Sequence, residues 1–143
     1  MEDSLHYTLL AAHTLFQKRF LLRLMREYPG LLPGQPKVID YLMSHPASFQ
    51  REIAEGCLIE PATLSPILEK MESAGLIRRE KADGNRKNSI VSLTGRGQET
   101  GRKLRDLFHQ TEDEACEGLS EEQKENLLRN LRHVQNNCRR NFQ

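Results

Sequence analysis

The spacing of the apolar residues changes along the chain, and this change constrains the fold more than any other feature. Up to Gly75 apolar residues recur every three or four positions, as expected for helices with one buried face. Over 76–93 they fall into two short strand-like runs, and the helical spacing then returns. The sequence therefore predicts a mainly α fold that contains one β-hairpin.

Local start and stop signals divide the first half into helices. A long helix is predicted over 4–28, because Ser4 can cap its start and Pro29 with Gly30 ends it. Two short helices follow, the first ending near 45–46 and the second over 51–57. A third begins at Pro61, since proline at the first helical position lacks only an N–H that would be unpaired anyway. Gly75 is expected to end it.

The second half begins with the predicted hairpin. Its strands are expected at 76–80 and 89–93, joined by the turn-forming residues 82–85. Thr94 is a good N-cap for a helix that continues to about 117. Ser120 and the glutamine three residues later form a capping box at the start of a last amphipathic helix.

Charge is nearly balanced overall but unevenly distributed, with 21 Lys and Arg against 20 Asp and Glu. Residues 78–105 contain 9 basic and 3 acidic residues, a net charge of +6. Residues 106–126 contain 1 basic and 8 acidic residues, a net charge of −7. The basic block can face a polyanion, although a solvated helical face would show the same pattern.

Helix, short helix, turn, helix and hairpin is the order of a winged helix-turn-helix, and the polar residues suit DNA. Small side chains at the start of the helix from Pro61 allow close approach to base edges. The hairpin tip at 84–88 has two cations and two amides on a loop narrow enough for a minor groove. A structural three-helix core with a charged turn is the alternative. The predicted DNA-binding residues are Gln50, Arg51, Pro61, Ala62, Thr63, Ser65, Pro66, Lys70, Arg79, Arg86 and Lys87.

Residues 53–97 resemble the MarR (multiple antibiotic resistance regulator) family of transcription regulators. The run IAEGCLIEPATLSPILEKMESAGLIRR is similar to the helix-turn-helix of that family. ADGNRKNSIVSLTGRG resembles its wing, including the L-T-x-x-G element at Leu93, Thr94 and Gly97. The resemblance implies an obligate homodimer in which each subunit presents one winged helix-turn-helix to double-stranded DNA. It also implies a repressor that a small ligand or cysteine oxidation releases from DNA.

The resemblance also implies a domain layout. The chain is expected to form one domain, 1–143, in which a winged helix-turn-helix with a two-stranded wing is flanked by N- and C-terminal dimerisation helices. The DNA-binding lobe is expected at about 35–98 and the dimerisation helices at about 4–28 and 99–142.

Two parts of the sequence depart from the family pattern. The wing of the family usually carries Asp-Arg-Arg, whereas this chain has Asn85-Arg86-Lys87. Because lysine does not replace arginine in a narrow groove, Arg86 is expected in the groove and Lys87 on phosphate. The sequence of 63–66 is closer to the branch that senses organic hydroperoxides. The first predicted helix lacks the reactive cysteine of that branch, so oxidant sensing by that route is not expected.

The family resemblance implies a small aromatic effector in a cleft between the dimerisation helices and the DNA-binding lobe, and a mixed polar and aromatic set of residues near that seam supports it. An apolar pocket with a few polar groups suits a phenolic compound or an aromatic acid. A histidine there can donate a hydrogen bond to a carboxylate or hydroxyl. The alternative is that these aromatic residues form dimer core. The predicted effector residues are His13, Phe16, Phe20 and Tyr41.

The sequence lacks the spacings that indicate catalysis or metal binding. Cys57, Cys116 and Cys138 share no metal or redox spacing, and the five histidines do not cluster. There is no nucleophilic motif or glycine-rich phosphate loop. We therefore expect no enzyme activity, no metal and no cofactor. No apolar run approaches the roughly 20 residues of a membrane span, and the N-terminus does not resemble a signal peptide, so a cytoplasmic location is expected.

Three functions remain to be compared. The first is a DNA-binding homodimeric repressor, the second a winged-helix module that binds another protein, and the third a ligand- or haem-binding helical dimer without DNA. A protein-binding wing would present aromatic or aliphatic residues, whereas 84–88 presents arginine and lysine. The same charges argue against the third function and favour the first.

Overall fold

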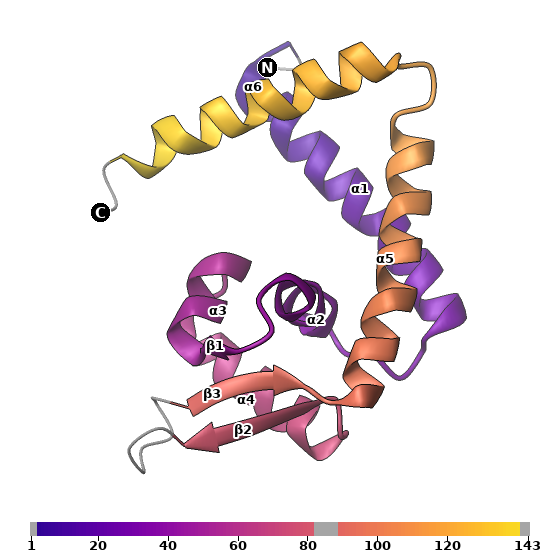
Figure 1. Cartoon of the computed structure of the whole chain (residues 1–143). Helices are drawn as coiled ribbons and strands as arrows, with labels where there is room; N and C mark the ends of the chain where they lie inside the picture. The colour runs from indigo at the N-terminus through magenta and orange to yellow at the C-terminus, as the bar shows by residue number, and fades with distance from the viewer. Residues whose placement is uncertain (1–2, 82–88, 141–143) are drawn as a thin grey trace. The chain divides into compact units, whose positions relative to one another are not determined.

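The computed structural model describes residues 3–81 and 89–140. The chain divides into two compact units, Met1–His109 and Gln110–Gln143. Within the described residues the elements, labelled in Figure 1, are α1 (Leu5–Glu27), α2 (Gln35–Ser44), β1 (Ser48–Phe49), α3 (Gln50–Cys57), α4 (Pro61–Ser73), β2 (Ile77–Lys81), β3 (Ser89–Leu93), α5 (Gly95–Ala115) and α6 (Glu121–Arg139).

The predicted helix starts are confirmed, because each depends on local hydrogen bonds. Ser4 Oγ accepts a hydrogen bond of 3.1 Å from the backbone N–H of Tyr7 at the start of α1. At the start of α6, Ser120 Oγ accepts from the N–H of Gln123 at 3.1 Å. The Gln123 side chain accepts in return from the N–H of Ser120 at 2.8 Å. These contacts satisfy N–H groups that the first turn of a helix leaves without partners.

The three strands form one antiparallel sheet in the order β1-β3-β2. In the hairpin Arg79 pairs with Val91, and Ser48 of β1 pairs with Val91 from the other edge. The two strands of the hairpin are confirmed to within a residue, but β1 was not predicted. The predicted turn at 82–85 lies outside the described residues. Thr94 Oγ1 accepts from the N–H of Gly97 at 3.1 Å, as expected for an N-cap.

The core of Met1–His109 lies among α2, α3, α4 and the sheet, together with the buried residues of α1 and of α5. In Figure 1 α2 and α3 pack next to β3, whereas α4 packs next to β2. The inner faces predicted for α3 and α4 are buried, except that Ile67 is only half-buried. The fully buried side chains of largest volume in this unit are Ile39, Leu42, Ile53, Leu64, Leu68, Met71, Ile77, Leu104, Leu107, Val38 and Val91.

Two glycines allow α5 to approach the rest of its unit closely. A Cβ atom on Gly97 would overlap the backbone carbonyl oxygen of Leu76. A Cβ atom on Gly101 would lie 2.5 Å from the sulfur of Met43 and 3.2 Å from a methyl group of Ile39. The first turns of α5 therefore pack against α2 and the start of the hairpin with no room for larger side chains.

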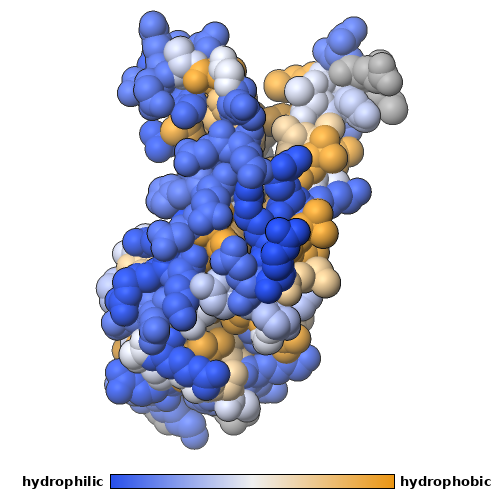
Figure 2. Space-filling model, turned by 90° about the vertical axis from the view of Figure 1, so that its right-hand side faces the viewer, coloured by the Kyte–Doolittle hydropathy of each residue, from blue (hydrophilic) through white to orange (hydrophobic). Residues whose placement is uncertain are grey.

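Most of α1 is exposed in the single chain, although its sequence is rich in leucine. Only Phe20 and Leu24 of this helix are buried. Leu15 and Leu22 are 64% and 67% exposed, and Figure 2 shows hydrophobic residues reaching the surface among hydrophilic ones. In the other unit, α6 has no buried residue within its described span. The exposed leucines thus leave apolar surface for an interface.

Among the described residues, no helix is both long and apolar enough to cross a membrane.

Candidate nucleic-acid interface

The turn between α3 and α4 sets how the second of these helices is presented. Leu58 ends α3 in the left-handed conformation, with φ of 55°, and its side chain is 78% exposed. The next residue, Ile59, donates its N–H to the carbonyl of Ala54 at 3.0 Å. Glu60 then caps α4, and Pro61 takes the first helical position, as predicted. The chain reverses here within three residues, as in a helix-turn-helix.

The first turn of α4 has small side chains and is tied to α3. Ala62 and Thr63 are exposed, and Ser65 is half-buried. The amide nitrogen of Gln50, the first residue of α3, donates a hydrogen bond of 2.8 Å to Ser65 Oγ. Ser65 Oγ donates in turn to the carbonyl of Pro61 at 3.4 Å. The structure thus brings six of the predicted DNA-binding residues to adjacent helix starts, namely Gln50, Arg51, Pro61, Ala62, Thr63 and Ser65.

Pro66 lies inside α4 and is exposed. Proline has no N–H, so the carbonyl of Ala62 receives no hydrogen bond from the residue four positions later. The first turn of α4 is therefore linked to the rest of the helix by fewer backbone hydrogen bonds than usual.

The predicted basic residues differ in how available their charges are. Arg51 of α3 and Lys70 of α4 are exposed. Arg79 of β2 instead forms two hydrogen bonds, of 3.2 and 3.4 Å, with both carboxylate oxygens of Glu72, and its side chain is only 9% exposed. A role for Arg79 at DNA stays a prediction. Arg86 and Lys87 lie outside the described residues.

Some contacts that position this surface were not predicted from the sequence. Arg96, in the first turn of α5, donates from Nη1 to the carbonyl of Ala74 at 3.1 Å, and so caps the end of α4. Thr94 Oγ1 donates to the neighbouring carbonyl of Gly75 at 2.6 Å. Both contacts join residues about 20 positions apart in sequence. A basic residue within the L-T-x-x-G element, at its second variable position, is the signal that points to Arg96.

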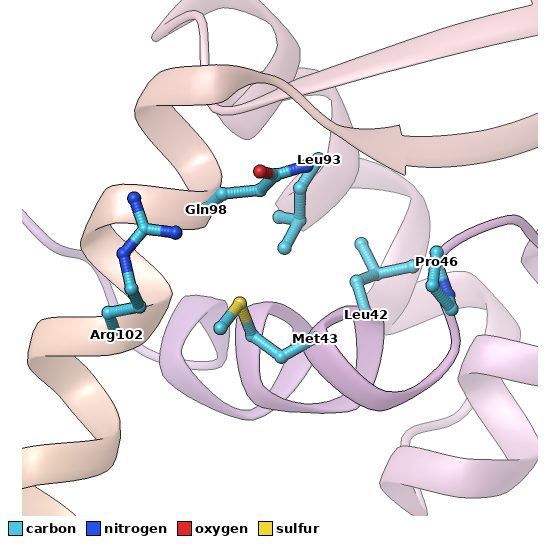
Figure 3. A pocket seen from close by; sticks show the side chains of 6 residues that line it. All are labelled: Leu42, Met43, Pro46, Leu93, Gln98 and Arg102. Atoms are coloured by element: carbon cyan, nitrogen blue, oxygen red, sulfur yellow. The ribbon is translucent and has the colours of Figure 1, made fainter.

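The four predicted effector residues lie in separate environments. Phe20 stacks on Phe108 of α5, with ring centroids 4.1 Å apart and an angle of 7° between the rings. Tyr41 of α2 stacks on His45, the residue that caps the end of this helix, also at 4.1 Å. His13 is exposed, and Phe16 of the same helix is half-buried. None of the four lines the cavity shown in Figure 3, so their shared pocket stays a prediction.

The structure indicates that the buried thiol of Cys57 is unreactive at neutral pH. Burial raises its pKa from the ordinary value of 9.0 to about 11; nearby Lys37 opposes the shift, and Asp40 adds to it. The thiol also donates to the carbonyl of Lys37 at 3.6 Å. A thiol with such a pKa is not a reactive thiolate at neutral pH. Within 3–81 and 89–140, no group of three His, Cys, Asp or Glu side chains could hold a metal ion.

Comparisons with known proteins agree with this geometry. The sequence model of the MarR family matches residues 30–87. The HTH-type transcriptional regulator BilQ of Clostridium symbiosum is 28% identical over 117 residues, which cover 80% of this chain and 81% of BilQ. The transcriptional regulator HosA of Escherichia coli is 28% identical over 122 residues, which cover 85% and 90% of the two chains. The transcriptional repressor CouR, solved bound to a 23-mer DNA duplex, superposes with a TM-score of 0.81 at 27% identity, and the match covers 93% of each chain.

Proposed function

The chain belongs to the MarR family of DNA-binding transcription regulators, and on this premise we propose that it is a homodimeric, ligand-responsive repressor. Its DNA target is an operator with two half-sites, each read by one subunit. Regulators of this family are not enzymes, which agrees with the expectation from the sequence. Because a DNA-binding repressor must reach its operator, the proposal includes a cytoplasmic location.

The start of α4 carries the proposal for the DNA-reading surface. Ala62 and Thr63 are exposed there on the first turn of a 13-residue helix. Small side chains let a helix enter a major groove deeply enough to reach base edges. The hydrogen bond from Gln50 to Ser65 holds the neighbouring hydroxyl in place. Arg51 and Lys70 are exposed cations that suit phosphates. Arg86 and Lys87 complete the proposed surface on the wing.

Exposed leucines support the proposal of a homodimer. Leu10, Leu15 and Leu22 of α1 are each more than half exposed, and so is Leu128 of α6. Covering this apolar surface with a second copy stabilises the assembly by the hydrophobic effect. A two-fold dimer places two recognition helices on half-sites about one helical turn, roughly 34 Å, apart. The proposed layout keeps a DNA-binding lobe at about 35–98 between dimerisation helices at about 4–28 and 99–142.

The remaining part of the proposal is that a ligand releases the protein from its operator DNA. A ligand frees the operator only if it binds better to a conformation whose two recognition helices no longer fit the half-sites. A small aromatic acid or phenol near His13, Phe16, Phe20 and Tyr41 is the proposed effector. Titration of salicylate-like acids against the operator complex, with His13→Ala in parallel, tests this part. A response that is identical in the variant would assign the ligand to another site.

A fluorescence-anisotropy titration at increasing salt concentration tests DNA binding. The probe is duplex DNA from upstream of the protein's own gene, and a scrambled duplex is the reference for specificity. Arg86→Ala should weaken binding and lower the slope of log affinity against log salt by about one unit, because one phosphate or groove contact is lost. Lys37→Ala removes an exposed cation outside the proposed surface and should leave the slope unchanged. Equal affinity for both duplexes, or an unaltered slope in Arg86→Ala, would contradict the proposal.

Sedimentation tests the dimer separately. The protein should sediment as a dimer at micromolar concentration. Leu22→Glu places a charge on the exposed face of α1 and should shift the equilibrium towards the single chain. Lys18→Glu changes the charge of the same helix at an already polar, exposed position and serves as the matched control. A stable monomer of the unmodified protein at this concentration would rule the dimer out.

A further inference from the structure

The exposed face of α4 is apolar over its first two turns. Ala62 and Pro66 lie four positions apart, so they share one face of the helix, and both are exposed. Thr63, beside Ala62, is exposed as well. On the opposite face Leu64 and Leu68 are fully buried in the core. The part of α4 that would meet base edges therefore presents two methyl groups and a proline ring.

The composition of α4 excludes the usual way of reading bases through paired hydrogen bonds. Arginine reads guanine in this way, and asparagine or glutamine reads adenine. None of these three residue types occurs in α4, which the structure describes from end to end. Glu69 and Lys70 lie on the same exposed face, but about two turns beyond Ala62.

The polar groups nearest to this face already have partners. Ser65 Oγ accepts a hydrogen bond of 2.8 Å from Gln50 and donates to the carbonyl of Pro61 at 3.4 Å. Pro66 has neither an N–H nor a polar side chain. The Thr63 hydroxyl is the side-chain donor that remains for base edges in these two described turns.

The chemistry of the exposed face selects a feature of the DNA. In the major groove only thymine carries a methyl group, at its C5 position, whereas the other bases present hydrogen-bonding groups. The methyl groups of alanine and threonine contact the thymine methyl, and contact between apolar groups that excludes water is favourable. A helix with methyl groups and a proline ring on its exposed face thus suits thymine.

We propose that α4 distinguishes its operator from other DNA by contacts to thymine methyl groups. Ala62, Thr63 and Pro66 are the specificity-determining residues, and each half-site carries thymine, on either strand, at the base pairs that face them. The inference rests on the proposed function, because it needs α4 in the major groove. It adds which base the helix selects and through which atoms.

Selection from a pool of random duplexes by the full chain supplies the binding sequence for the test. The selected half-sites should contain recurring thymines. Each such thymine is then replaced by deoxyuridine, which lacks only the C5 methyl group, and affinity is measured by fluorescence anisotropy. Loss of one contacted methyl should weaken binding about fourfold, the equivalent of one buried apolar carbon. Deoxyuridine between the half-sites should leave affinity unchanged.

A second change in the DNA separates the methyl group from the rest of the base pair. Replacing a contacted thymine by cytosine should weaken binding. The same duplex with 5-methylcytosine, which restores a methyl group at C5, should regain about fourfold in affinity. An equal affinity for cytosine and 5-methylcytosine would contradict a methyl contact.

Two variants on one face of α4 locate the contact. Pro66→Arg should remove the difference between thymine and deoxyuridine at a position in each half-site and favour guanine there, since arginine reads guanine. Lys70→Gln, four positions later, removes a cation that suits phosphate. It should weaken binding to both duplexes equally and leave their ratio unchanged. If Pro66→Arg fails to fold, Ala62→Ser, which replaces a methyl by a hydroxyl, should lower the ratio instead.

Equal affinity for the thymine and deoxyuridine duplexes would overturn the inference. So would selected half-sites without recurring thymines, or an unchanged ratio in the folded Pro66 and Ala62 variants. In each of these cases the protein would still bind DNA specifically, so the proposed function would stand. Selection that enriches no sequence would contradict the proposed function instead, and the two failures are therefore distinguishable.

Discussion

The side-chain amide of Gln50 donates a 2.8 Å hydrogen bond to Ser65 Oγ, joining the first residue of α3 to the fifth residue of α4. This bond couples two helix starts that are 15 positions apart in sequence. It restricts the rotation of the Ser65 hydroxyl and of the Gln50 side chain together. A DNA surface that is ordered before binding loses less conformational entropy when the complex forms.

Removal of this hydrogen bond should affect DNA binding more than folding. We expect Gln50→Ala to weaken operator affinity about fivefold, the equivalent of one ordinary hydrogen bond, measured by anisotropy at fixed salt. The midpoint of urea unfolding should change little, since Gln50 is only half-buried. Gln17→Ala, at an exposed position of α1, is the matched control. Unchanged operator affinity would show that the bond does not contribute to binding.

Leu58 should be replaceable by glycine with a gain in stability. Its φ of 55° is unfavourable for a residue with a Cβ atom, and its side chain is 78% exposed. Leu58→Gly should therefore raise the free energy of unfolding by about 1 kcal/mol, after the greater freedom of glycine in the unfolded chain is included. Leu58→Ala keeps the Cβ atom and should have little effect. A lower free energy of unfolding for Leu58→Gly than for Leu58→Ala, measured by urea denaturation, would refute this account.

Two neighbouring glycines at the start of α5 should respond oppositely to alanine. Gly97→Ala places a methyl group against the carbonyl oxygen of Leu76 and should destabilise the fold by about 1–3 kcal/mol or more. Nothing lies within 4 Å of the corresponding position at Gly95. Gly95→Ala should therefore be neutral or stabilise by up to about 1 kcal/mol. Thermal unfolding of both variants measures the two changes in stability. A similar loss of stability in both would contradict the expected difference.

The thiols of Cys57 and Cys138 should differ in reactivity because the first is buried and the second is exposed. At about pH 8 a disulfide reagent should label exposed Cys138 quickly and Cys57 only on unfolding. The unfolded chain releases the Cys57 proton near its ordinary pKa of 9.0, whereas the folded chain retains it to about 11. The free energy of unfolding should therefore fall as pH rises from about 9 to about 11, and this part of the fall should be absent in Cys57→Ala. Fast labelling of Cys57 in the native protein would disprove the assignment.

Features that depend on nearby residues could be predicted from the sequence. Ser4, Thr94 and Ser120 each cap a helix through hydrogen bonds to residues three positions later, so their pattern is readable along the chain. The buried faces of α3 and α4 could also be predicted, because they consist of apolar residues three or four positions apart in the sequence. The family resemblance placed the helix-turn-helix on residues that the structure brings together.

Features that depend on distant residues could not be predicted in this way. β1 has two residues, too few to show an alternating pattern, and it forms because β3 offers a second edge. Phe20 stacks on Phe108, a residue 88 positions later in the sequence. The cavity shown in Figure 3 likewise forms only where α2, β3 and α5 meet. Spacing within one helix indicates a buried face but does not identify which residue will cover it.

Pro66 has a consequence for how the first turn of α4 is studied. Scanning mutagenesis replaces side chains, but what this proline removes is a main-chain hydrogen bond from residue 66 to the carbonyl oxygen of Ala62, which no side-chain substitution at Ala62 restores. Only a change at position 66 itself, such as Pro66→Ala, restores the missing amide and occupies that oxygen. Pro66→Ala therefore changes the backbone hydrogen bonding of α4, an effect that side-chain substitutions at 61–65 do not produce.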